Sequence, residues 1–207
     1  MKNTILLLVL LAAQNLFAQA DYEKGMTKAF ELWENGNPEE ASALFERIAA
    51  AENDNWLPKY YIALVNTTEA FKPENSSKVE ALVNKAQNAL DTELNKNPEN
   101  PELLVMQAMI YTALIAHDPM TNGQKYSAKV MQLYNEAEAI APENPRVVLS
   151  KAQFEMGSAK FFGKDIHPIC ERIKNSLVLF DNFKPESHFS PKWGRKQAEA
   201  AIMNCEQ

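Results

Sequence analysis

Two cysteines and three histidines are the residues of this sequence that could support thiol or metal chemistry. Cys170 and Cys205 could form a disulfide, stay as buried thiols, or supply a nucleophile. A catalytic cysteine needs a base held close to it, and a zinc site needs three or four ligands. His167 stands three residues before Cys170, a spacing that could place both on one helical face, but Pro168 between them indicates a helix start. We therefore favour a structural disulfide over free thiols or thiol chemistry.

Other catalytic motifs are missing from the sequence. It contains no glycine-rich phosphate loop, no Cys-x-x-Cys pair, no His-Glu-x-x-His and no Gly-x-Ser-x-Gly. His117 and Asp118 are followed by Pro119 and Gly123, which is more typical of a turn with a polar rim than of a catalytic site. We expect a binding protein that has no catalytic activity and needs no metal or cofactor.

The N-terminus has the three-part layout of a cleaved signal peptide. Lys2 precedes an apolar run of nine residues from Ile5 to Ala13, and small residues lead to Ala20. Spanning a bilayer takes roughly 20 apolar residues, and no cysteine follows the run at a lipidation position. We expect residues 1–20 to be removed, leaving a periplasmic or secreted protein without a stable membrane anchor. An oxidising compartment also favours the disulfide.

The charge balance argues against a nucleic-acid partner. The chain has 21 Lys and Arg against 27 Asp and Glu, a net charge of −6, and loss of the leader lysine makes it more negative. Nucleic-acid affinity comes mostly from basic side chains that neutralise phosphates. The acids are spread along the chain, which is typical of solvated helices. With 46% hydrophobic residues, the chain can bury one continuous core.

A repeat with a period near 44 residues runs through the chain. Ala63, Ala108 and Ala152 end three segments that align without gaps, at spacings of 45 and 44 residues. The second half of each unit has a small or apolar residue, a bulky one four later and a proline eight beyond: Ala86, Leu90 and Pro98; Val130, Tyr134 and Pro142; Ile173, Leu177 and Pro185. Apolar residues recur at intervals of three and four, so each unit is predicted to be a pair of helices.

Capping residues followed by proline predict where helices begin. They are Asn37-Pro38, Asn100-Pro101, Asn144-Pro145 and Ser190-Pro191. Turns at Asn75-Ser76-Ser77 and Thr121-Asn122-Gly123 are expected between the two helices of a unit. The predicted organisation is a single all-α domain over residues 21–207. Its antiparallel hairpins span about 21–55, 56–100, 101–144 and 145–187, and a capping helix covers 190–204.

The spacing of alanine, bulky residue and proline resembles the tetratricopeptide repeat family. The first hairpin matches it with Ala29, Ala41 and Phe45, although Asn53 stands where the family has proline. The later units are longer than the family's period of about 34, with the excess near the hairpin turn. HEAT-like repeats, with a period of about 40 to 47, are the rival interpretation, but the turn residues favour tetratricopeptide. The resemblance implies a short right-handed solenoid of stacked hairpins, as in small exported bacterial proteins with such repeats and no assigned activity.

In the resembled family, the first helix of each repeat lines a concave groove that holds a partner peptide or helix. By aligned position the resemblance implies a groove of Tyr60, Leu64, Thr67, Val105, Met109, Thr112, Leu149, Gln153 and Met156. These side chains could instead face the core, or the C-terminal helix could cover them. We expect an exported protein-binding module or scaffold. The alternatives are a homodimer that pairs through this face and a small enzyme using His167 and Cys170.

Overall fold

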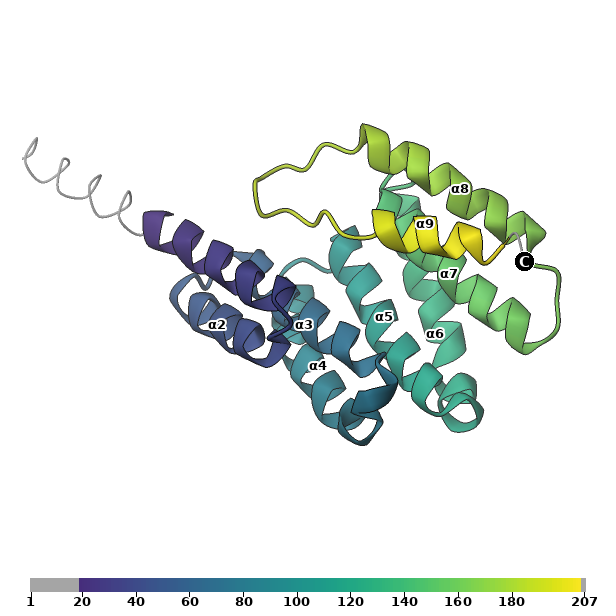
Figure 1. Cartoon of the computed structure of the whole chain (residues 1–207), viewed down its shortest axis with the longest axis horizontal. Helices are drawn as coiled ribbons and strands as arrows, with labels where there is room; N and C mark the ends of the chain where they lie inside the picture. Colours follow the sequence, from purple (N-terminus) through teal and green to yellow (C-terminus); the bar gives the residue numbers. More distant parts are fainter. Residues whose placement is uncertain (1–18, 206–207) are drawn as a thin grey trace, which may run out of the picture.

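A computed structural model of the chain describes residues 19–205, and every regular element in that range is a helix. A first helix runs through residues 19–34. It is followed by α2 (Pro38–Ala51), α3 (Trp56–Ala70), the short 3₁₀ helix η1 (Pro73–Lys78), α4 (Val79–Lys96), α5 (Pro101–His117), α6 (Pro119–Ile140), α7 (Pro145–Phe161), α8 (His167–Asn182) and α9 (Arg195–Met203) (Figure 1). Residues 1–18 of the predicted signal peptide lie outside the described range, so the signal peptide stays a prediction.

Consecutive helices pair into hairpins that stack side by side (Figure 1). The first helix packs on α2, with the rings of Phe30 and Phe45 5.4 Å apart. The next pairs are α3 with α4, α5 with α6, and α7 with α8. The first helices of successive hairpins, α3, α5 and α7, also contact one another, and α9 packs on α8. The predicted all-α architecture of stacked antiparallel hairpins with a capping helix is confirmed.

Asparagine side chains begin three of the stacked helices. Asn100 accepts a hydrogen bond from the backbone N–H of Glu102, and Asn144 accepts one from Arg146, as capping asparagines do. Asn55, which no proline follows directly, caps α3 in the same way. Asn37 precedes α2 but its side chain makes no capping hydrogen bond.

The extra length of the repeats is taken up mostly as helix. The prediction of a turn at Thr121-Asn122-Gly123 is wrong, because α6 already begins at Pro119. Asp118 accepts a hydrogen bond from the backbone N–H of Thr121 and so caps α6 directly after the end of α5. In the preceding hairpin, Asn75-Ser76-Ser77 lies within η1.

The repeated small and bulky positions build the core. Ala63, Ala108 and Ala152 are almost fully buried, as residues at a close helix approach must be. Leu90 and Tyr134 are buried between hairpin layers. Over residues 19–205, no helix combines the length and apolar character needed to cross a membrane.

Residues 183–194 depart from the predicted helix at 190–204. Ser190-Pro191 does not start a helix, and α9 begins only at Arg195. The chain between α8 and α9 instead runs as a long loop towards the first hairpins and back (Figure 1). Gly194 ends this crossing segment at φ +113°, and a Cβ there would lie 2.6 Å from Cζ of Phe180. Glycine is therefore required where the segment turns into α9.

Candidate functional site

The nine residues predicted to line a groove do not lie together on an open surface. Six of them, Tyr60, Leu64, Thr67, Val105, Leu149 and Met156, are buried in the core. Met109, Thr112 and Gln153 are half-buried. The prediction of an open groove is wrong for the six buried residues. The first helices of the hairpins contact each other and their second helices, so these positions face neighbouring layers.

The crossing segment, residues 183–194, covers part of the first-helix layer. Phe189 is buried and packs edge-on against Tyr22 and in a stacked geometry against Phe30, with ring centroids 5.6 and 6.0 Å away. The hydroxyl of Tyr61 donates a hydrogen bond to the carbonyl oxygen of Phe189 at 2.7 Å. A segment of the chain itself therefore covers this part of the first helix and of α3.

Trp193 is the second anchor of the crossing segment. Its indole N–H donates to the hydroxyl of Tyr60 at 2.7 Å. The hydroxyl of Tyr60 in turn lies 3.4 Å from a carboxylate oxygen of Glu102. Burial raises the pKa of Tyr60 well above its usual range, with the Glu102 carboxylate adding to the effect. Burial likewise raises the pKa of Tyr61, so both phenols stay neutral hydrogen-bonding groups at physiological pH.

A buried ion pair lies behind these tyrosines. Arg146 of α7 is 1% exposed, and its Nε and Nη2 donate to Glu102 of α5 at 2.6 to 2.9 Å. The side chain of Asn144 donates to the same carboxylate at 2.7 Å. Phe183 of the crossing segment stacks on the guanidinium, whose carbon lies 4.3 Å from the ring centroid. The pair thus connects two hairpins with the crossing segment.

A cavity of about 590 Å³ adjoins this pair. The turns between hairpins and the crossing segment form its walls, which include Trp56, Pro98, Phe183 and Lys184, and both Glu102 and Arg146 line it. This volume is within the range of small-molecule sites, which are roughly 300–1,000 Å³. The cavity is therefore the candidate functional site.

A second cavity of about 610 Å³ lies between α2, α3 and α4. Its buried amide, Asn66, already donates to the hydroxyl of Ser42 and to the carbonyl of Ile62. The donors of this amide are satisfied within the fold, which makes the second cavity the weaker candidate.

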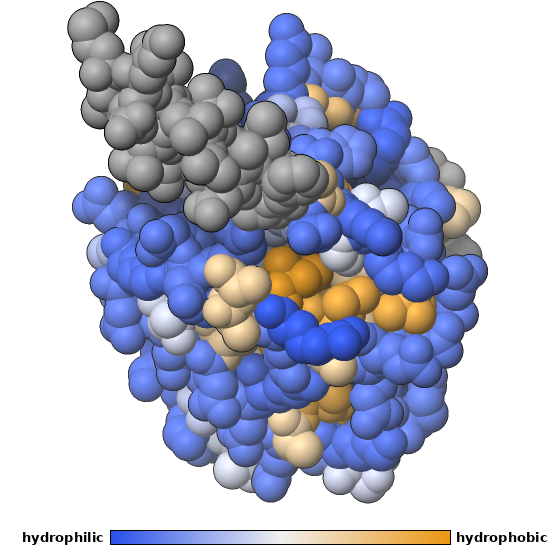
Figure 2. Space-filling model, turned by 90° about the vertical axis from the view of Figure 1, so that its left-hand side faces the viewer, coloured by the Kyte–Doolittle hydropathy of each residue, from blue (hydrophilic) through white to orange (hydrophobic). Residues whose placement is uncertain are grey.

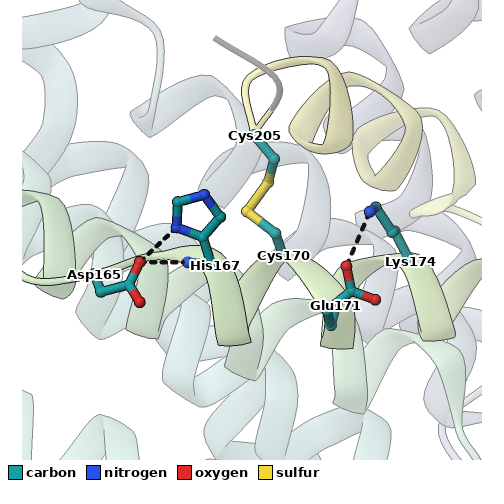
Figure 3. The surroundings of a disulfide bond; sticks show 6 residues. All are labelled: Asp165, His167, Cys170, Glu171, Lys174 and Cys205. Atoms are coloured by element: carbon teal, nitrogen blue, oxygen red, sulfur yellow. Dashed lines mark hydrogen bonds and ion pairs between the residues drawn. A yellow bond between two sulfur atoms is a disulfide. The ribbon is translucent and has the colours of Figure 1, made fainter.

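The predicted disulfide is present. Cys170 on α8 is bonded to Cys205 just after α9, with the Cα atoms 6.0 Å apart (Figure 3). The bond leaves no free thiol for the alternative of an enzyme that uses His167 and Cys170. His167 is 87% exposed and pairs with Asp165, whose carboxylate also accepts its backbone N–H at the start of α8 (Figure 3). These hydrogen bonds lower the pKa of Asp165, as expected of a carboxylate whose ionised form accepts hydrogen bonds.

Exposed apolar residues gather at the turns within hairpins and at the end of the solenoid. Large exposed side chains at these turns are Phe71 (41%), Met120 (70%), Phe161 (59%) and Phe162 (66%). Figure 2 shows the face at the first-hairpin end, which is hydrophilic around a central apolar area. Within the described residues no further repeat covers that end. The terminal repeat of a solenoid needs a polar outer face for this reason.

Comparisons with known proteins show which solved structures share this architecture. No family model and no curated protein matches the chain. A crystal structure of TTC0263, a thermophilic TPR protein of Thermus thermophilus, matches with a TM-score of 0.63 and 18% identity over 89% of this chain and 82% of that one. The fold is tetratricopeptide-like. The HusA haemophore from Porphyromonas gingivalis matches with a TM-score of 0.77 and 24% identity, over 89% of this tetratricopeptide-like chain and 92% of that one.

Sequence reasoning missed the ion pair and the crossing segment. One signal was available: Glu102 and Arg146 stand at the same position of consecutive repeats, each directly after an Asn-Pro pair. Equivalent positions in stacked tetratricopeptide-like units lie next to each other, so opposite charges there predict an ion pair. No comparable pattern marks the path of the crossing segment.

Proposed function

We propose that this chain is an exported carrier of a haem-type tetrapyrrole, bound in the cavity beside Glu102 and Arg146. The observation that carries the proposal is the likeness to a haemophore over nearly the whole length of both chains. At 24% identity the likeness shows a shared fold. The choice of ligand therefore also rests on the cavity of this chain.

The cavity combines aromatic walls with a lining that is mostly polar or charged, which suits a flat ligand that carries charged groups. Its volume is about 590 Å³, and Trp56 and Phe183 supply aromatic walls. Aromatic faces stack on planar rings, and small-molecule sites combine such faces with a few polar groups that fix orientation. Here the polar groups come from Arg146, Asn144 and the lysines of the rim.

The crossing segment argues against an extended peptide as the ligand of this surface. Phe189 is seated among Tyr22, Phe30 and Tyr61, so a peptide in the family's manner would have to displace it. A small ligand in the cavity leaves Phe189 in place.

Titration of the mature protein with haemin tests the proposal. We expect a saturable Soret change and quenching of tryptophan fluorescence at micromolar haemin. The variant Trp56→Leu should bind at least about tenfold more weakly, since loss of an aromatic contact and its buried area removes more than about 1.4 kcal/mol. Trp33→Leu is the matched control, because Trp33 is also partly buried but lies in the first helix, away from the cavity. Absence of saturable binding by the wild type refutes the proposal.

Export is tested by intact mass. We expect the protein recovered from outside the cytoplasm to lack the first 18 or 20 residues of the sequence. Reduction should add the mass of two hydrogen atoms, because Cys170 and Cys205 are bonded. An uncleaved chain would contradict the export part of the proposal.

A protein-binding module is the second candidate, favoured by the tetratricopeptide-like fold and by the exposed aromatic residues at the hairpin turns. Such a partner would contact Phe161 and Phe162, not the buried residues of the predicted groove. If wild type and a Phe161→Ser/Phe162→Ser variant recover the same proteins from envelope extracts, this candidate fails. A homodimer is the other alternative, and light scattering that finds a monomer at high micromolar concentration removes it.

A further inference from the structure

The guanidinium of Arg146 has one donor group that the fold leaves unused. Nε and Nη2 donate to Glu102, whereas Nη1 is buried and has no hydrogen-bond acceptor. A buried donor without an acceptor destabilises the fold, and more strongly when the group is charged. An acceptor supplied by a ligand would recover this loss.

The protein's own acceptor cannot turn towards Nη1. The Glu102 carboxylate is held by Arg146 on one side, by the amide of Asn144 at 2.7 Å, and by the hydroxyl of Tyr60 at 3.4 Å. The indole N–H of Trp193, which belongs to the crossing segment, donates a hydrogen bond to that hydroxyl. The free donor of Arg146 is therefore a fixed feature of the fold.

Phe183 covers one face of the guanidinium. Phe183 stacks on it at 4.3 Å, is only half-buried, and belongs to the non-helical crossing segment. Arg146 and Phe183 both line the cavity. Because Nη1 is buried, a ligand in the cavity can contact it only when side chains that cover the guanidinium, such as Phe183, move aside.

The surroundings favour an anionic acceptor with planar geometry. The formal charges of the lining cancel, because Lys96, Lys184 and Arg146 are matched by Glu99, Glu102 and Glu186. Glu102 occupies Nε and Nη2 of Arg146, so Nη1 is the part of the guanidinium that is left for an acceptor. Guanidinium groups bind carboxylates through short charge-assisted hydrogen bonds. The amino ends of α5 and α7 also meet here, which adds positive potential.

We propose that Nη1 of Arg146 anchors a carboxylate of the bound ligand. The class of the ligand rests on the proposed function. For a haem-type tetrapyrrole, the carboxylate is one of the propionates.

The first test needs only the wild-type protein. Mesoporphyrin and its dimethyl ester differ in the two carboxylates and share the ring, so both are titrated in the same detergent buffer. We expect the free acid to bind at least about tenfold more tightly, as a charge-assisted hydrogen bond into a buried site provides. Equal affinity for acid and ester overturns the inference and leaves the proposed function intact.

A variant of Arg146 tests whether the preference for the free acid depends on this residue. Arg146→Gln should remove the preference for the acid, whereas Lys151→Gln, on the same helix and paired with Glu138 away from the cavity, should retain it. Retention of the preference in folded Arg146→Gln overturns the assignment to Arg146. If Arg146→Gln does not fold, the comparison of acid and ester in the wild type is combined with the following measurement.

A small carboxylate tests the site without the tetrapyrrole. Benzoate is titrated into ¹⁵N-labelled wild type, and the Nε–H signal of Arg146 and the indole N–H of Trp193 are followed by NMR. Saturable shifts of both, absent with benzamide, support the carboxylate site even if no porphyrin binds, in which case only the proposed function fails. No shift with benzoate and no preference for the acid together overturn the inference.

Discussion

Breaking the buried pair of Glu102 and Arg146 should destabilise the protein strongly, whereas removing both partners should not. Glu102→Met leaves the guanidinium 1% exposed without its acceptor. Loss of one partner of a buried pair costs about 3–5 kcal/mol, while replacing both by apolar groups is often neutral. We expect Glu102→Met to lower the free energy of unfolding by about 3–5 kcal/mol, and the Glu102→Met/Arg146→Met double variant by less than about 1 kcal/mol.

Urea unfolding followed by circular dichroism, with the disulfide intact, measures these values. Glu46→Met is the control, because the pair of Glu46 with Lys85 is well exposed and such pairs contribute about 0–1 kcal/mol. The reasoning is refuted if Glu102→Met costs less than about 1 kcal/mol, or if the double variant is destabilised at least as much as Glu102→Met alone. The first result would mean that water or the crossing segment compensates the buried charge. The second would mean that other contacts of the two side chains, such as those of Asn144 and Tyr60 with Glu102, stabilise the fold.

Three further predictions concern the crossing segment and the C-terminal cap. Reducing the bond between Cys170 and Cys205, which closes a loop of 35 residues, should lower the free energy of unfolding by about 3–4 kcal/mol in urea titrations. Tyr61→Phe leaves the carbonyl of Phe189 without its donor and should cost about 1–3 kcal/mol, with faster proteolysis within residues 183–194. Because burial raises the pKa values of Tyr60 and Tyr61 above 10.0, the stability that the neutral phenols contribute should be constant below pH 9 and fall as pH rises above about 10. Thermal melts from pH 7 to 11 check this, and an unchanged melting temperature would contradict it.

The sequence predicted the features of this fold that depend on neighbouring residues. Asn100-Pro101 and Asn144-Pro145 begin helices because a capping side chain and a proline act within one turn. The hairpin stack was predictable because the repeat places small residues such as Ala108 at equivalent positions. These signals are local or periodic, so they can be recognised in one chain.

The predictions that failed depended on contacts between distant residues. Ser190-Pro191 resembles a helix start, yet the packing of Phe189 and Trp193 against the first two hairpins keeps the chain non-helical there, with a turn at residues 187–190. The same contacts explain why Tyr60 is a core residue and not part of a groove. Helix propensity was overridden by tertiary packing, which the sequence pattern does not encode.

The path of the crossing segment changes how the molecule can unfold. Stacked repeats usually interact only with their neighbours, so they can lose terminal units one at a time. Here the hydrogen bonds from Tyr61 to Phe189 and from Trp193 to Tyr60 join residues 128 and 133 positions apart. Fraying of the first hairpins therefore also breaks the contacts of the C-terminal segment, which couples the two ends into one cooperative unit. The same contacts raise the mean sequence separation of native contacts, so we expect the chain to fold more slowly than an open array of hairpins of equal length.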